Sequence, residues 1–300
     1  MDKDRLKKMR WMISFLMPFC LLVCMLAKID RIFFKANKGF CFHFIDRPLT
    51  DSSWETEGLF PAHLLSQPFS YLGKGAQTFV FESQDKNYVL KFYKFPSHMR
   101  RFSWISHPFG YLFSPKRIAL KEHNEKRFAL SYMSYFLAFQ QLQKESGVVY
   151  VHLHPTTHLR QTIQLKDKTG NTYQIPCDEI GFVLQRKGVP FVPLLQSALA
   201  DSRIETAQQM IDSLLQLIVS RCSKGITDLD NMDHDNYGWS EGQAMHLDIG
   251  RFMINEEVKK PSVYQQEVVR VTSPLADYLQ KKSPELFRYY QQKIHGLSIE

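Results

Sequence analysis

The stretch that decides the fold reads Gly225-Ile-Thr-Asp-Leu-Asp-Asn-Met-Asp-His-Asp-Asn236-Tyr-Gly, and His246-Leu-Asp248-Ile-Gly250 follows closely. A group of Asp residues, then an Asn, a hairpin's length of chain and Asp-x-Gly is typical of a phosphoryl-transfer site. In such a site the first acidic side chain orients or deprotonates an attacking hydroxyl. The Asn and the later Asp hold Mg²⁺ on the nucleotide phosphates. Asp-x-Gly alone is common by chance, so the order and the spacing are what indicate this chemistry.

A second signal lies upstream, in Leu72-Gly73-Lys-Gly75-Ala-Gln-Thr78-Phe-Val80-Phe-Glu. It predicts strand, glycine turn and strand, and two glycines let a backbone approach phosphates without a Cβ in the way. Tyr88-Val-Leu-Lys91-Phe-Tyr then alternates like a strand and carries one Lys among apolar residues. Such a Lys can reach the phosphates and pair with a helix Glu. An ordinary glycine-bearing hairpin and an edge-strand lysine are the alternative interpretations.

Together these segments resemble the protein-kinase-like superfamily. Gly73-x-Gly75-x-x-Thr78-x-Val80 is in register with the family's glycine-rich loop, and Lys91 matches the phosphate-anchoring Lys of the third strand. Asp248-Ile-Gly250 is similar to the Asp-Phe-Gly element. The residue pattern from Gly225 onward is also similar to that of the phosphoinositide-kinase branch. The resemblance covers residues 66–255 and is carried by short motifs.

The resemblance implies ATP and Mg²⁺ as cofactors and a bilobal α+β fold, with an N-terminal antiparallel sheet plus helix and a mainly helical C-terminal lobe. It also implies a role for each matching residue. The nucleotide would be held by Gly73, Lys74, Gly75, Val80 and Lys91, with Glu122 or Glu125 as the carboxylate that pairs with Lys91. The metal ligands would be Asn236 and Asp248, and the catalytic acid would be Asp230 or Asp228.

Several departures from the family pattern bear on catalysis. The third loop glycine is Thr78, and the position five residues before Asn236, where the family places its catalytic Asp, is Asn231. Asp230 and Asp228 stand six and eight residues before Asn236, so the catalytic loop would be longer. The chain has no His-Arg-Asp triplet and no Ala-Pro-Glu, and only fifty residues follow Gly250. Nucleotide binding is therefore better supported by the sequence than phosphate transfer.

The composition is that of a globular domain, with 300 residues, 44% hydrophobic and 23% charged. The formal net charge is +8, part of it from basic residues before position 11, and no basic block of nucleic-acid type occurs. The sequence therefore predicts no nucleic-acid partner and favours attraction to anionic lipid or phosphate.

Residues 11–27 form an uncharged, mostly apolar run that predicts a single-pass membrane anchor, near the lower length limit for a transmembrane helix. A signal peptide is the alternative, but no small-x-small cleavage site follows the run. Basic residues flank both sides, so the positive-inside rule does not decide the orientation. Use of ATP and five scattered Cys place the domain on the cytosolic side of the membrane.

In the rest of the chain, hydrophobic periodicity and turn-forming or capping residues predict the helices and strands. Three strands are expected over 69–95, a helix from Ser114-Pro115 to about Glu145, and a hairpin around Asp167-Lys-Thr-Gly-Asn171. Ser202-Arg-Ile-Glu205 is read as a capping box before the most regular helix of the chain, which Gly225 ends. Two short helices are expected to start at Ser273-Pro274 and Ser283-Pro284.

The predicted organisation is a basic N-terminus (1–10), an anchor (11–27), a juxtamembrane segment (28–65), an N-terminal lobe (66–187) and a C-terminal lobe (188–300). The favoured function is a membrane-anchored kinase-like domain that binds ATP and Mg²⁺ and transfers phosphate to a hydroxyl acceptor, which is a protein, a lipid headgroup or a small molecule. The alternatives are a catalytically inactive pseudokinase and a membrane-anchored protein-interaction domain. His152, His154 and His158 invite a metal site, but satisfied or exposed histidines are the favoured interpretation.

Overall fold

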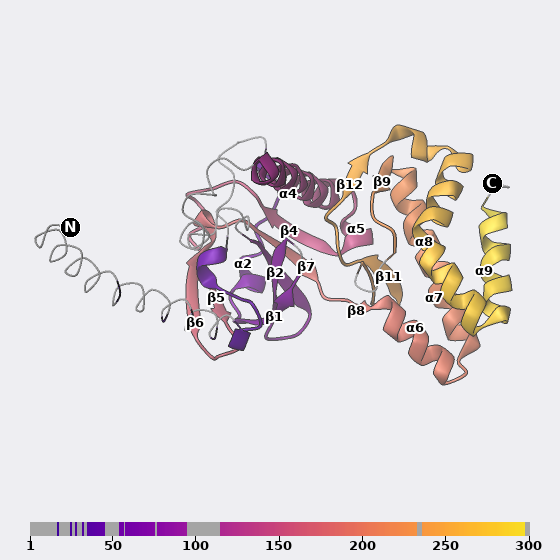
Figure 1. Ribbon diagram of the computed structural model, residues 1–300, viewed down its shortest axis with the longest axis horizontal. Helices are drawn as coiled ribbons and strands as arrows, with labels where there is room; N and C mark the ends of the chain where they lie inside the picture. Colours follow the sequence, from indigo (N-terminus) through magenta and orange to yellow (C-terminus); the bar gives the residue numbers. More distant parts are fainter. Residues whose placement is uncertain are drawn as a thin grey trace, which may run out of the picture.

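The computed structural model describes residues 35–45, 54–56, 58–75, 77–94, 115–232 and 236–297, together with Met17, Met25, Lys28 and Ile32. For residues 115–125 it describes the backbone path alone. The described chain has two parts, one built on a large sheet and one built mainly of helices (Figure 1). The α+β class predicted from the sequence is therefore confirmed.

The large sheet has seven strands in the order β4-β7-β3-β2-β1-β5-β6. The three predicted strands over 69–95 and the predicted hairpin around 167–171 are all present. The strands are β1 Phe69–Lys74, β2 Thr78–Ser83, β3 Tyr88–Tyr93, β4 Val148–His152, β5 Thr162–Lys166, β6 Thr172–Pro176 and β7 Phe182–Arg186.

The expectation of an antiparallel N-terminal sheet is wrong in one place, because β5 runs parallel to β1. After β4 the chain crosses to the opposite edge of the sheet, and the β5–β6 hairpin joins there. All the other pairings in this sheet are antiparallel, so the sheet is mixed. The hairpin covers the edge that β1 would otherwise present to solvent, which is a common way of protecting an edge strand.

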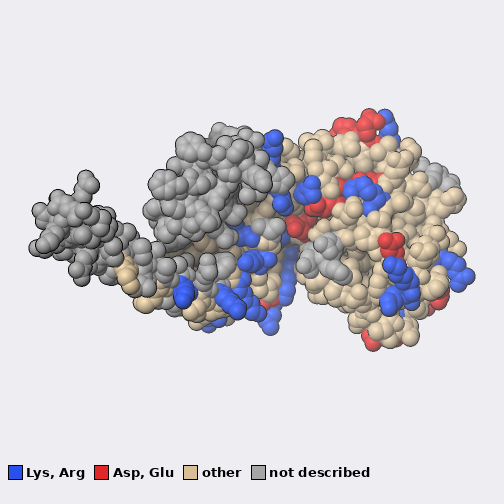
Figure 2. Space-filling model, viewed as in Figure 1, with Lys and Arg blue, Asp and Glu red and all other residues tan. Residues whose placement is uncertain are grey.

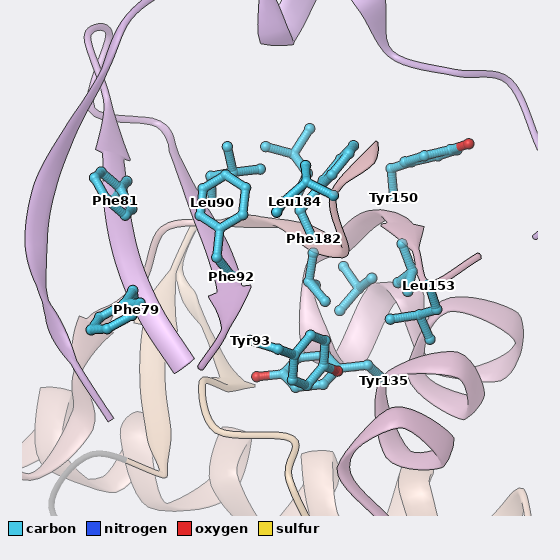
Figure 3. Close-up of a cluster of buried hydrophobic side chains, with 14 of the residues drawn as sticks. Phe79, Phe81, Leu90, Phe92, Tyr93, Tyr135, Tyr150, Leu153, Phe182 and Leu184 are labelled. Atoms are coloured by element: carbon cyan, nitrogen blue, oxygen red, sulfur yellow. The ribbon is translucent and has the colours of Figure 1, made fainter. Parts of the chain in front are cut away.

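The core of this part is rich in aromatic side chains (Figure 3). Phe81 and Phe92 pack edge to face with 5.7 Å between ring centroids, and Tyr93 lies against Tyr135 of the helix α4 (Pro115–Gln141). Each fully buried side chain of this size contributes about 1.5–3 kcal/mol to stability. The short helices and turns that complete this part are η1 Phe42–Phe44, α2 Ala62–Leu65, α5 Gln143–Ser146 and η4 Cys177–Glu179.

The segment expected to be juxtamembrane contributes to this core. Phe40 is buried and lies 5.1 Å, centroid to centroid, from both Tyr71 and Phe79. Phe42 stacks on Tyr173 of β6 at 4.8 Å. These contacts make the residues from 37 to 45 an integral part of the sheet's packing.

A second apolar cluster lies among the helices α6 Phe191–Ala200, α7 Ile204–Ser223, α8 Pro261–Lys282 and α9 Pro284–Gly296. The apolar face predicted for the helix before Gly225 is buried along α7. Small strands connect the two parts. These strands are β8 Val189–Pro190, β9 Ile226–Asp228, β10 Tyr237–Ser240, β11 Gln243–His246 and β12 Phe252–Ile254, with the 3₁₀ turn η5 Glu256–Lys259 after β12.

One predicted capping box and one predicted helix start are wrong. Ser202 has φ +56° and Arg203 is the residue that caps α7, without a side-chain cap bond, so no capping box forms. The predicted start at Ser273-Pro274 lies inside α8. Pro274 has no N–H for the carbonyl of Arg270, and the Ser273 hydroxyl donates to that carbonyl at 3.0 Å instead, which lets the helix continue.

In the part of the chain that the structure describes, no helix is long and apolar enough to span a bilayer. The predicted anchor, 11–27, lies outside the described residues except for Met17 and Met25.

Candidate functional site

Lys91 and the Asp248 segment meet where the two parts of the molecule join. Lys91 lies in the middle of β3, and its Nζ donates to the carbonyl of Leu247 at 2.6 Å. Leu247 directly precedes Asp248, so a residue of the large sheet contacts the Asp-x-Gly segment 156 positions later in the chain. The structure therefore brings together two of the residues that the sequence singled out.

The helix facing Lys91 presents a tyrosine to it. The Lys91 Nζ donates to the Tyr135 hydroxyl at 3.1 Å, and the ring centroid lies 5.4 Å from the Nζ. Glu122 and Glu125 precede Tyr135 by thirteen and ten residues on the same helix, about 15–20 Å along its axis. Their side chains lie outside the described residues, so the predicted pairing with Lys91 stays a prediction. Tyr135 occupies the turn of α4 that meets Lys91.

The environment of Lys91 shifts its protonation. The side chain is 8% exposed. Burial lowers the pKa of Lys91 to about 8, and the nearby Asp248 carboxylate acts in the opposite direction. Burial also raises the pKa of the Tyr135 hydroxyl well above its usual value, so Tyr135 stays neutral. Because Tyr135 is neutral, it does not neutralise the Lys91 ammonium, whose charge stays open to an incoming anion.

The glycine-bearing turn between β1 and β2 lies over the same place. The turn is closed by the N–H of Gly75, which donates to the Thr78 carbonyl at 3.0 Å, and by the Lys94 side chain on the Gly75 carbonyl. A Cβ added at Gly250 would come within 3.4 Å of an Asp248 carboxylate oxygen and 3.8 Å of the Gln77 side-chain oxygen. The turn residue Gln77 and the Asp-x-Gly segment therefore face each other.

The residues in and beside this turn that were predicted to bind nucleotide differ in what surrounds them. Val80 pairs with Lys91 across β2 and β3. A Cβ at Gly73 would meet nothing within 4 Å, so open space lies beside it. Lys74, between the two glycines, lies instead toward Gly39, where its Nζ would be 2.1 Å from an added Cβ.

Asn236 and Asp248 are brought together by the β10–β11 hairpin. Tyr237 is opposite His246 in the ladder, so the residues on either side of the hairpin's open end are neighbours. The Asn236 carbonyl accepts from the N–H groups of Leu247, at 2.8 Å, and Asp248, at 3.3 Å. The twelve-residue spacing thus acts as the sequence suggested, as one hairpin.

The residues present fit a hard cation only in part. Within the described ranges, no three or more His, Cys, Asp or Glu side chains converge as a complete metal site. Asn236 and the exposed Asp248 are adjacent through their backbones, and both carry side-chain oxygens, which suits Mg²⁺ because that ion usually takes one or two protein ligands plus phosphate and water. Asp233 and Asp235 of the same loop lie outside the described residues.

The two candidate catalytic aspartates differ in their surroundings. Asp228 is 4% exposed and pairs with the Arg221 guanidinium at 3.3 Å. Burial raises the pKa of Asp228 to about 6, against the effect of Arg221. The Asp230 side chain is 37% exposed and pairs with Arg251, just after Gly250, at 2.7 Å. Asp230 is therefore the acid that faces solvent beside the Asp-x-Gly segment.

A buried ionic network supports the loop that carries both acids. Glu267 of α8 binds Arg221 at 2.8 Å, the Asp228 N–H at 3.1 Å and the Thr227 hydroxyl at 2.9 Å. Arg270 donates to the other Glu267 oxygen at 2.8 Å and to the Asn231 side chain at 2.8 Å. Burial alone would raise the pKa of Glu267, but the Asp228 N–H and Arg221 lower it overall. The network fixes the backbone of the loop, and its two guanidinium groups balance its two carboxylates.

Sequence reasoning missed Tyr135, Gln77, Arg221, Glu267 and Arg251. Arg221 did leave a signal, because it stands among the buried positions of α7 next to Cys222, where an unpaired charge would be costly. The others lie on elements whose contacts depend on how the two parts meet.

Of the three histidines at 152, 154 and 158, His152 has protein partners at both ring nitrogens. His152 is buried, with one ring nitrogen 2.7 Å from the Ile180 carbonyl and the other 3.2 Å from the Thr156 hydroxyl. Burial lowers the pKa of His152, so the ring is neutral at physiological pH.

Comparison with known proteins gives structural likeness at low similarity. No protein-family model matches the chain, and no curated protein matches it. Among solved structures, two of the bifunctional kinase-methyltransferase WbdD match with TM-scores of 0.33 and 0.35 at 15% and 14% identity. They cover 72% and 73% of this chain and 42% and 43% of WbdD. A co-crystal structure of WbdD with the kinase inhibitor LY294002 matches with a TM-score of 0.33 over 74% of this chain. The chain spans less than half of these matched chains, and at these scores the likeness transfers neither a ligand nor an activity.

Proposed function

We propose that this chain is a membrane-anchored kinase-like domain that binds ATP with Mg²⁺ and transfers phosphate to a hydroxyl acceptor. The observation that carries the proposal is the contact of Lys91 with the Leu247 carbonyl, which places a buried ammonium beside Asp248. Phosphate recognition requires a positively charged side chain close to oxygen ligands that hold a metal ion. The membrane part of the proposal rests on the apolar run 11–27.

Each residue has a distinct task in this proposal. Lys91 binds the phosphates, and the glycine turn covers them. Asn236 and Asp248 would hold Mg²⁺, which supplies positive charge for the phosphate oxygens. Asp230 orients the acceptor hydroxyl, because its carboxylate faces solvent beside Gly250 through the contact with Arg251. Asp228 positions the loop through its buried contact with Arg221.

A second candidate is nucleotide binding without turnover. It is supported by Tyr135, a neutral side chain in contact with Lys91, and by the ion pair that occupies Asp230. In this version Arg251 keeps the Asp230 carboxylate from an acceptor. Turnover assays separate the two candidates, while nucleotide affinity is common to both.

We expect the affinity for ATP–Mg²⁺ to fall as the pH rises through about 8. The pKa of Lys91 is about 8 in the free protein, so above that pH the protein must take up a proton to present an ammonium to the phosphates. The dissociation constant should then rise by up to about tenfold per pH unit until the pKa of the complex is reached. Isothermal titration calorimetry across this range measures it.

Lys91→Ala provides the control for the pH experiment. It should weaken nucleotide binding by about 1–3 kcal/mol and remove the pH dependence, because no titrating ammonium remains. Exposed Lys281 in the last turn of α8 is the matched site, and Lys281→Ala should leave both unchanged. A pH profile shared by wild type and Lys91→Ala would contradict the role of Lys91. Absence of any ATP affinity in the folded wild type would favour the protein-interaction alternative.

We expect Asp230→Asn to lower phosphate transfer by about 10²–10⁴-fold with nucleotide affinity kept, the range for loss of general-base catalysis. Asp228→Asn should act on stability instead, because its buried carboxylate pairs with Arg221. Turnover per folded molecule, with the folded fraction taken from circular dichroism, compares the two. Equal turnover in wild type and Asp230→Asn, both above background, would assign the acid elsewhere. Nucleotide affinity without turnover in the wild type would favour the second candidate.

A further inference from the structure

Four lysines surround the turn that leads into the large sheet. Lys35, Lys38, Lys74 and Lys168 are all exposed. Lys35 and Lys38 lie in the turn itself, where the Lys38 N–H donates to the Lys35 carbonyl at 3.1 Å. The Lys168 N–H donates to the Asn37 side chain at 2.9 Å, and the Lys74 ammonium lies against Gly39. We refer to these four residues as the lysine cluster.

The turn is fixed to the tip of the β5–β6 hairpin. Asn37 is buried and donates to Asp167 at 2.8 Å, while the Tyr71 hydroxyl donates to the Lys38 carbonyl at 3.4 Å. Phe40 then enters the core. The lysines therefore have fixed backbone positions and face solvent together.

The acidic group in contact with this turn does not face solvent. Asp167 is buried and accepts hydrogen bonds from Asn37, Thr169, Asn171 and Tyr173. Burial alone would raise the pKa of Asp167, but these bonds lower it overall, so it is ionised. Among the described residues, Lys35, Lys38 and Lys168 bring three exposed ammonium groups against the one buried carboxylate of Asp167, so this surface carries a net positive charge. Figure 2 shows Lys and Arg side chains gathered on the lower part of this lobe, with few acidic ones among them.

The chain reaches this cluster directly from the predicted anchor. Lys28, Ile32, Lys35 and Ala36 are helical, and in the sequence Lys35 follows the end of the apolar run at Ala27 by eight residues. Eight residues of chain reach at most about 29 Å when fully extended. Exposed charges farther apart than the Debye length, about 8 Å at physiological salt, are largely screened, so the lysines interact with an anionic surface when the domain rests on it.

We propose that the lysine cluster is a docking surface for an anionic phospholipid bilayer, which fixes the orientation of the domain against the membrane. This proposal rests on the predicted anchor for its reach, and it is independent of nucleotide binding. The bilayer is favoured over other polyanions because the apolar run would bring it to the cluster. A basic side chain near an anionic membrane contributes about fivefold to binding, so several together hold the domain against the surface.

The test is amide hydrogen exchange on the full chain reconstituted in nanodiscs. One set of discs contains phosphatidylcholine alone, and the other contains about 30% phosphatidylserine, which gives a negative surface potential. We expect slower exchange over residues 166–172 and 37–40 in the anionic discs alone, with the difference reduced at about 0.5 M salt. Lys38→Glu/Lys168→Glu should abolish the difference. The exposed pair at the end of α8 is the matched control, and Lys281→Glu/Lys282→Glu should retain it.

Exchange that is equal in the two kinds of disc would overturn the proposal, and so would protection that persists in Lys38→Glu/Lys168→Glu. Exchange over β3 and β7 reports whether that variant is folded. If it is not, the single Lys168→Glu change, at the exposed hairpin tip, replaces it. Extraction with alkaline carbonate tests the anchor separately. A chain released by carbonate that still sediments with anionic vesicles at low salt would refute the anchor and support the cluster.

Discussion

Replacing Arg221 by alanine is expected to lower the free energy of unfolding by about 3–5 kcal/mol, the range for breaking a buried ion pair from one side. Arg221 is fully buried, pairs with Asp228 and Glu267, and lies 5.5 Å from the centre of the Phe252 ring. The substitution leaves the buried Asp228 carboxylate without its cation and leaves Glu267 with Arg270 alone. Urea unfolding followed by circular dichroism measures the change.

The control for Arg221→Ala is Arg288→Ala, because Arg288 is exposed on α9. It should change stability by no more than about 0.5 kcal/mol. Arg221→Ala/Asp228→Asn should recover part of the loss, since the double change removes the buried carboxylate that has lost its cation. A loss no greater than that of Arg288→Ala would show that the network adds little to stability.

Replacing Asp248 by asparagine is expected to abolish Mg²⁺-dependent nucleotide binding with the fold intact. The side chain is exposed, so its charge is not needed for packing, and it is the anionic member of the pair with Asn236. Mg²⁺ binds neutral amide oxygens much less readily than carboxylates. The thermal shift produced by ATP with and without Mg²⁺ gives the measurement.

Asp277→Asn, an equal change at an exposed position of α8, is the control for Asp248. It should retain the full Mg²⁺-dependent shift. A wild-type shift that survives Asp248→Asn would contradict the kinase-like proposal and support the interaction-domain alternative.

The elements that the sequence predicted correctly are those set by local pattern. β1 and β2 alternate in burial along the strand, the hairpin at 167–171 has an Asp-Lys-Thr-Gly-Asn turn, and the apolar face of α7 repeats at helical spacing. The link between Asn236 and Asp248 also followed from chain length, because one hairpin fits the spacing. Local signals were sufficient in these places because the deciding contacts are close in sequence.

The errors arose where distant contacts decide. Pro274 reads as a helix start, but the hydroxyl of Ser273 replaces the missing backbone donor and α8 continues. Ser202 reads as a cap, but the turn from α6 needs a left-handed residue at that position. The parallel pairing of β5 with β1 depends on a crossing that no local pattern records. The contact of Tyr135 with Lys91 could not be predicted without the position of β3.

The hydrogen bond from Asn37 to the hairpin tip allows residues 35–40 to transmit force into the large sheet. A pull applied at Lys35 loads the Asn37–Asp167 bond first and then the β5–β6 hairpin. Because β5 is hydrogen-bonded alongside β1, the force passes next to the strand that ends in Gly73 and Lys74. Phe40 resists extraction, since it is wedged among Tyr71, Phe79 and Phe81. In the proposed membrane-anchored protein, tension at Lys35 would reach the glycine turn through β5 and β1 before it reaches the helices α6 to α9.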